Sequence, residues 1–252
     1  MNVDYSQFLN MIPEVTLMAI LLIVFITDLF TAKKPGEEKT RAWFNPLVCV
    51  LMLAHILINI FPTASLTAFG GMYATNASVG VIKTILAFSV LIVCIQSREW
   101  LQRPDTDFKE GEFYELVIAT LLGMNMMVSA NHFLLFFLGL EMASVPMACL
   151  VAFDKYRHNS AEAGAKFILT ATFSSGVMLY GISFLYAATG TLYFDDVMAK
   201  ISATPLCIMG MVFFFSGLGF KISLVPFHFW TADTYQGAPT TVSGYLSVTS
   251  KG

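Results

Sequence analysis

A few charged residues interrupt the long apolar runs of this 252-residue sequence. Glu141 lies in the middle of the run HFLLFFLGLEMASVPMACLVAF, and Lys221 lies in the stretch GLGFKISLVPFHFW. Three more lysines, Lys83, Lys166 and Lys251, also fall inside apolar runs. A charge at the centre of a bilayer costs about 2.5–3.5 kcal/mol on insertion scales, so charges kept there usually have a function. The pattern therefore predicts chemistry that needs buried charge, such as proton or ion transfer.

A proline follows each of the two deepest charges. Pro146 comes five residues after Glu141, and Pro226 comes five residues after Lys221. Proline lacks an N–H and clashes with the carbonyl four residues back, so each proline frees a carbonyl next to the charge. Broken helices with a charge at the break are typical of ion transporters. We therefore expect helix breaks at both prolines, and the length of the run Pro205–Tyr235 agrees with a broken helix.

A buried carboxylate and several lysines could together transfer protons. A lysine in an apolar setting favours its neutral form, whereas a lysine beside a carboxylate keeps its proton, so an ion pair that opens and closes would act as a proton valve. On this interpretation Lys166 is the natural partner of Glu141. Lys221 is the central carrier, and Lys251 is the next site. His228 either relays protons or lines the pathway without titrating. A fixed ion pair that holds helices together is the structural alternative.

The remaining charges near the apolar runs have plainer interpretations. Lys83 lies near the start of its run, where its side chain could snorkel to the headgroups as an interface anchor. Acids at the ends of runs are expected to be solvated by water or headgroups, and these are Glu14, Asp28, Glu115 and Glu162.

The composition is that of a membrane protein. Hydrophobic residues make up 56% of the sequence and charged residues 12%, whereas a soluble domain contains about 25% charged residues. The net charge of −3 is too small to indicate a nucleic acid partner. The four cysteines lie far apart without metal-type spacing, and we interpret them as small core hydrophobes. No glycine pattern or histidine pair predicts a bound cofactor, a metal or a redox centre.

Apolar runs close to the ~20 residues that cross a bilayer follow one another along the chain. They predict an all-α, polytopic transmembrane bundle of about eight helices. The segment Thr191–Thr204 is either a short interfacial helix or a loop. The expected spans are Ile12–Phe30, Trp43–Phe61, Val79–Gln96, Phe113–Ala130, His132–Phe153, Ser160–Thr189, Pro205–Tyr235 and Ala238 onward.

The basic residues of the links support this count of spans. Nine fall in the first, third and fifth links, and Lys200 alone falls in the others. Because basic residues concentrate in cytoplasmic links, this alternation predicts that the N-terminus lies outside.

The segments LGLEMASVP, SAEAGAKFILT, GLGFKISLVPFHFWTADTYQGAP and SVTSK resemble the proton-translocating, antiporter-like subunits of respiratory complex I. The resemblance implies fourteen helices with two inverted five-helix repeats. It implies three N-terminal helices over 1–112 and the first repeat, helices 4–8, over 113–252, with the chain an N-terminal fragment ending within helix 8. It assigns Glu141 to helix 5, Lys166 to helix 6, Lys221 to the broken helix 7 and Lys251 to helix 8.

The same resemblance implies a function. The chain would move protons through the buried glutamate and lysines as a subunit of a bacterial NADH–quinone oxidoreductase, coupled to quinone reduction elsewhere. NADH and quinone would bind other subunits, so this chain would carry no cofactor. Its partners would be other membrane subunits of complex I and the lipid bilayer, with no nucleic acid. It would lie in the bacterial inner membrane with a periplasmic N-terminus. The alternatives are a subunit of a multisubunit cation/proton antiporter and a scaffold in a membrane hydrogenase-type complex.

Overall fold

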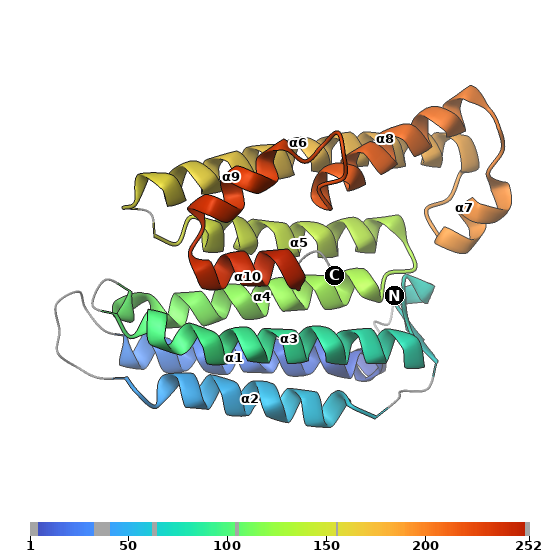
Figure 1. Ribbon diagram of the computed structural model, residues 1–252. Coiled ribbons are helices and arrows are strands. Elements are labelled where there is room, and N and C mark those ends of the chain that lie inside the picture. The colour runs from blue at the N-terminus through green and yellow to red at the C-terminus, as the bar shows by residue number, and fades with distance from the viewer. Residues whose placement is uncertain (1–4, 33–40, 62–64, 104–105, 155, 250–252) are drawn as a thin grey trace.

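The computed structural model of the chain describes residues 5–32, 41–61, 65–103, 106–154 and 156–249. Its long helices lie side by side in one bundle (Figure 1), so the expected polytopic helical bundle is confirmed. The α-helices are α1 (Ile12–Thr31), α2 (Phe44–Asn59), α3 (Ala77–Leu101), α4 (Glu110–Val128), α5 (Phe133–Val151), α6 (His158–Thr189), α7 (Phe194–Lys200), α8 (Pro205–Lys221), α9 (Phe229–Gly237) and α10 (Thr240–Val248). The described residues also form the 3₁₀ helices η1 (Tyr5–Met11), η2 (Phe69–Gly71) and η3 (Asp107–Lys109).

Length and composition allow several of these helices to cross a bilayer. Among the described residues, four segments are long and apolar enough, namely Ser6–Thr31, α3, α5 and α6, while α2 and α8 are apolar but shorter. Large apolar side chains such as Phe30, Phe61 and Leu169 are exposed on the outside of the bundle. Lipid tails are as apolar as leucine, so such exposure suits helices surrounded by lipid.

The run 205–235 folds as two helices. Thr204 caps the start of α8 by accepting a hydrogen bond from the Cys207 N–H, and Pro205 occupies the first turn, where its missing N–H costs nothing. α8 ends at Lys221, and a non-helical turn containing Pro226 separates it from α9. The predicted broken helix is therefore confirmed.

Pro146, by contrast, does not break its helix. α5 continues without interruption from Phe133 to Val151 with this proline inside it. The predicted break is wrong here because one missing N–H removes a single hydrogen bond, while close packing on α4 supports the helix. A Cβ added at Gly139 would lie 2.6 Å from the backbone nitrogen of Met127, and one at Gly123 would lie 2.5 Å from that of Ala143. α4 and α5 thus approach backbone to backbone near Glu141.

A small hairpin, which the sequence did not predict, closes one end of the bundle. Strands β1 (Leu66–Ala68) and β2 (Tyr73–Thr75) pair antiparallel, with Ala68 opposite Tyr73. Gly70 and Gly71 turn the chain with φ values of 65° and 87°, which glycine adopts without steric cost. A bridge from Tyr73 to Ala130 ties the hairpin to the end of α4. The hairpin therefore lies where α1 and α3 begin and α4 ends.

The segment Thr191–Thr204, which was expected to be either a short helix or a loop, contains a short helix. α7 covers Phe194–Lys200, and Val197 on it is buried in a cluster with Phe133, Leu140 and Met178. Its position at a membrane interface stays a prediction.

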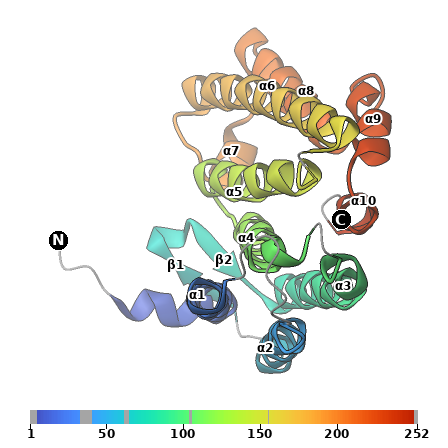
Figure 2. The same cartoon turned by 90° about the vertical axis from the view of Figure 1, so that its left-hand side faces the viewer.

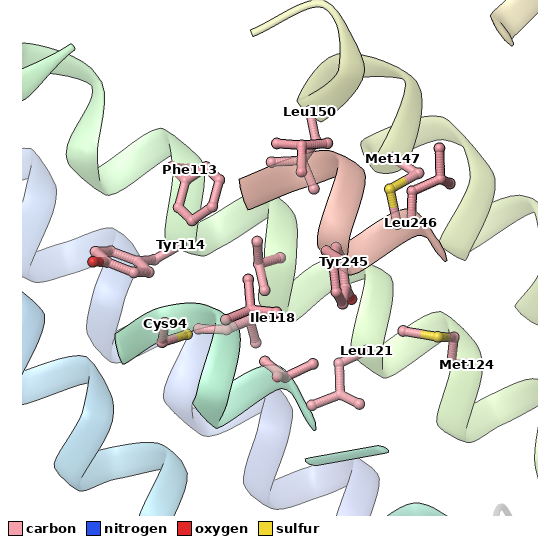
Figure 3. Packing of buried hydrophobic residues seen from close by; sticks show 14 of the residues in the cluster. Cys94, Phe113, Tyr114, Ile118, Leu121, Met124, Met147, Leu150, Tyr245 and Leu246 are labelled. Atoms are coloured by element: carbon pink, nitrogen blue, oxygen red, sulfur yellow. The ribbon is translucent and has the colours of Figure 1, made fainter. Parts of the chain in front are cut away.

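The largest apolar core draws residues from both ends of the chain. It includes Leu17 of α1 and Leu246 of α10, and Figure 3 shows Tyr245 and Leu246 packed among side chains of α3, α4 and α5. This core contains residues from both 1–112 and 113–252. The division of the chain into these two parts stays a prediction. Two cysteines, Cys94 and Cys207, are buried as expected, but Cys149 is exposed, so the interpretation as a core residue is wrong for it.

Candidate functional site

Glu141 of α5 and Lys221 of α8 form a partly buried ion pair. The Nζ atom of Lys221 lies 3.4 Å from Oε1 of Glu141, and the two side chains are 13% and 31% exposed. Lys221 is the last residue of α8, and the partial negative charge at a helix C-terminus favours a cation. The break after Lys221 thus delivers an ammonium group to the carboxylate of another helix.

Two serines complete this site. Lys221 donates a hydrogen bond from Nζ to Oγ of Ser144 at 2.8 Å, and Ser175 of α6 donates one to Oε1 of Glu141. Neither hydroxyl was predicted from the sequence. A signal existed for Ser144, because it follows Glu141 by three residues and so shares its helical face. Lys221 therefore has a second partner that can hold it when the carboxylate does not.

A cavity of about 320 Å³ adjoins Lys221. Since one water occupies about 30 Å³ in the liquid, the space is large enough for several waters. Most of its wall is apolar, including Met124 and Trp230, and its polar part consists of Ser144, Thr170, Ser174 and Lys221. The ammonium group thus has room to change partners beside a largely apolar surface.

Lys166 does not pair with Glu141. Its Nζ lies 2.7 Å from Oε1 of Glu162 and 2.6 Å from Oδ2 of Asp233 on α9, and all three side chains are about half exposed. The predicted Glu141–Lys166 pair is wrong because the two side chains lie at different heights along the bundle. Ser175, which contacts Glu141, lies nine residues further along α6 than Lys166, or about 13 Å at the helical rise. Asp233, a charged residue inside the run 205–235, was not predicted as a partner of Lys166 either.

A second buried ion pair joins α1 to α3. Nζ of Lys83 lies 2.6 Å from Oε1 of Glu14, and both side chains are only 2% exposed. Tyr73 donates to Oε2 of Glu14 at 2.9 Å and accepts from Nζ of Lys83 at 3.0 Å. Burial and the nearby Glu14 raise the pKa of Tyr73 above its ordinary value, so the phenol keeps its proton. The predictions of a snorkelling Lys83 and a solvated Glu14 are wrong, because the hairpin strand that carries Tyr73 covers both charges.

His228, another predicted site residue, lies apart from these pairs. His228 is exposed at the start of α9, and its ring stacks on Phe229 with centroids 4.9 Å apart. Within the described part of the chain it makes no hydrogen bond to Glu141 or Lys221, and its relay role stays a prediction. Lys251 lies outside the described residues.

The chain is similar to known membrane subunits. Residues 130–251 match the family model described as NADH:quinone oxidoreductase/Mrp antiporter, transmembrane. The NADH-quinone oxidoreductase subunit N of Phocaeicola vulgatus is 57% identical over 249 residues, which cover 99% of this chain and 52% of the relative. Subunit N of Azobacteroides pseudotrichonymphae is 45% identical over 252 residues, with coverage of 99% and 51%. A chain in the structure of respiratory complex I from Thermus thermophilus matches with a TM-score of 0.73 and 28% identity, covering 95% of this chain and 50% of that one. The chain thus spans about half the length of the curated relatives it matches.

Proposed function

We propose that this chain is a membrane-embedded, proton-translocating subunit of an NADH-quinone oxidoreductase, because it is similar to the N subunits of such complexes. Protons would move through Glu141 and Lys221, with Lys166 and Lys251 as neighbouring sites, coupled to quinone reduction elsewhere in the complex. The observation that supports this proposal most strongly is the Glu141–Lys221 pair beside the cavity.

The proposed step is the opening and closing of this pair. While it is closed, Glu141 is a carboxylate and Lys221 an ammonium. Two unit charges 4 Å apart attract by about 4 kcal/mol at an effective dielectric of 20, which corresponds to roughly a thousandfold change in a proton-binding constant. When the pair opens, the ammonium loses this stabilisation beside an apolar wall and releases its proton to the next acceptor. Ser144 keeps the amine partnered until a new proton arrives and the pair closes.

Lys166 suits an entry position in this scheme. It lies near the start of α6, at the end of the bundle that carries the basic links, and its side chain is 42% exposed. Its two acidic neighbours, Glu162 and Asp233, hold it as an ammonium that water can reach. We assign it the exchange of protons between that face and the deeper Glu141–Lys221 pair.

The proposal also includes the membrane in which the chain lies and the subunits beside it. The chain would lie in a bacterial inner membrane with its N-terminus on the periplasmic side, beside other membrane subunits of the complex. NADH and quinone would bind to those other subunits, and this chain would need no cofactor of its own.

A subunit of a cation/proton antiporter is the second candidate, because the matching family description names both kinds of complex. The geometry of the site favours protons over sodium as the transported ion. An ammonium group 3.4 Å from Glu141 repels a second cation from the same carboxylate. Transport that requires sodium would favour the antiporter.

The substitution Lys221→Arg in the full-length protein, within its complex, tests the proposal. Guanidinium keeps the positive charge but is effectively never deprotonated in proteins, so a fixed ion pair tolerates it better than a proton carrier does. We expect an assembled complex on a native gel and loss of most NADH-driven proton transport into vesicles. The control is Lys200→Arg, at the exposed end of α7. Transport at the wild-type rate in Lys221→Arg would overturn the proposal.

A further inference from the structure

The pair formed by Glu14 and Lys83 is a second buried carboxylate–lysine site, apart from the one proposed above. Figure 2 shows α4 between α5 on one side and α1 and α3 on the other. Glu141 and Lys221 lie on the α5 side, whereas Glu14 belongs to α1 and Lys83 to α3. The two sites are therefore separated by a helix.

The two sites share their chemical groups. Each combines a carboxylate, a lysine ammonium and a hydroxyl that bonds to the lysine, supplied by Ser144 in one case and Tyr73 in the other. The Glu14 site is tighter, because Tyr73 contacts both charges and the three side chains form a closed triangle. Every bond in this triangle is 3.0 Å or shorter, so a proton can pass directly between its members.

Further polar groups collect at the same end of the bundle. His55 of α2 is 2% exposed, and its Nδ1 lies 2.9 Å from Oγ1 of Thr16 and 3.2 Å from Nδ2 of Asn59. Asn125 of α4 is fully buried, and neither polar atom of its side chain has a hydrogen-bond partner among the described residues. The acids of α4 lie in its first turns, at the opposite end of that helix.

A purely structural clamp explains this arrangement poorly. Removing two charges from water costs several kcal/mol per ion, and apolar residues often replace a buried ion pair without loss of stability. Arginine is the residue that suits a permanently charged buried pair, whereas lysine readily gives up its proton when it is buried. A lysine bonded to both a carboxylate and a phenol has two routes for that proton.

We propose that Glu14 and Lys83 form a second proton-holding site, near the face of the membrane opposite the basic links. In its resting form Glu14 is a carboxylate and Lys83 an ammonium. Release of one proton by Lys83 leaves a neutral amine beside the carboxylate, which still accepts the hydrogen bond of Tyr73, and uptake of one proton by the amine restores the pair. The inference rests on the proposed function, because the proton that is exchanged is the transported one.

The test is a neutral pair, Glu14→Gln combined with Lys83→Gln, in the full-length protein within its complex. Two amides can still hydrogen-bond across the gap, but neither exchanges a proton. We expect an assembled complex whose NADH-driven proton transport into vesicles falls at least threefold. Tyr73→Phe removes only the bridging hydroxyl and should give a smaller loss, and Tyr180→Phe, at an exposed position on α6, is its control.

Two outcomes of the double variant overturn the inference. Transport at the wild-type rate would show that no transported proton needs the pair. Failure to assemble would show that the charges have a structural role, in which the ion pair holds α1 against α3. Lys221→Arg, measured in parallel, separates this inference from the proposed function. Loss of transport in Lys221→Arg with normal transport in the double variant overturns the second site alone, whereas normal transport in Lys221→Arg overturns the proposed function.

Discussion

Lys221 lies closer to a hydroxyl than to its counter-charge, because its Nζ is 2.8 Å from Oγ of Ser144. The distance from the same Nζ to the carboxylate of Glu141 is 3.4 Å. A lysine held in this way can leave the carboxylate without becoming an unpartnered buried amine, a state that carries a desolvation penalty. The hydroxyl therefore makes the opening of the ion pair easier.

Removal of this hydroxyl by Ser144→Ala should slow proton transport in an assembled complex. A hydrogen bond to a charged group contributes about 1.5–3 kcal/mol, so we expect a loss of at least about tenfold, smaller than the loss in Glu141→Gln. The measurement is NADH-driven acidification of vesicles. Ser183→Ala on α6 is the control, since its exposed hydroxyl donates to the carbonyl of Tyr180 on the same helix. Undiminished transport in Ser144→Ala would show that the hydroxyl has no part in the step.

Glu14→Gln on its own should destabilise the protein, in contrast to the double variant. It leaves the ammonium of Lys83 buried without a counter-charge, and breaking a buried pair from one side costs about 3–5 kcal/mol. Thermal unfolding in detergent should show a clearly lower Tm for this variant. Glu162→Gln, at a side chain that is 48% exposed, should leave the Tm nearly unchanged. Equal Tm values for the two variants would contradict the burial of the Glu14–Lys83 pair.

Local chemistry explains what the sequence could predict. The helices follow from apolar length. Pro226 lacks an N–H and disfavours a continuous helix, and it lies in the turn between α8 and α9. The depths of Glu141 and Lys221 also follow from their places in apolar runs. Each of these features depends on a few neighbouring residues.

The features that could not be predicted depend on contacts between distant segments. Whether Pro146 breaks α5 is decided by Gly123 on another helix, which lets α4 approach closely. The partner of Lys166 is decided by where α9 returns along α6, which places Asp233 within reach. The burial of Lys83 depends on a hairpin whose strands have only three residues each, too few to show a clear alternation.

The close approach of α4 and α5 gives a stability prediction. Gly139→Ala adds a methyl group that would lie 2.6 Å from the backbone nitrogen of Met127. Overpacking of this kind typically costs about 1–3 kcal/mol, so the Tm in detergent should fall. Gly176→Ala is the matched control on α6, because its added Cβ would meet nothing within 4 Å and alanine has the higher helix propensity. A lower Tm for Gly176→Ala than for Gly139→Ala would contradict the packing.

The orientation of the chain can be tested by labelling two exposed positions. Gln102 caps the end of α3 beside the basic link, and Met198 lies on α7 after α6. Three predicted spans, α4, α5 and α6, separate these positions, so they must lie on opposite faces. Basic residues concentrate in cytoplasmic links, so the Gln102 end should face the cytoplasm.

Single cysteines should be placed there, as Gln102→Cys and Met198→Cys, in a background where the exposed native Cys149 is replaced by serine. A membrane-impermeant thiol reagent should label the first only from the cytoplasmic side and the second only from the periplasmic side. Labelling of both from one face would contradict the number of spans between α3 and α7. Labelling of each from the opposite face to the expected one would preserve that number but reverse the orientation, and would place Lys166 rather than Glu14 at the periplasmic end.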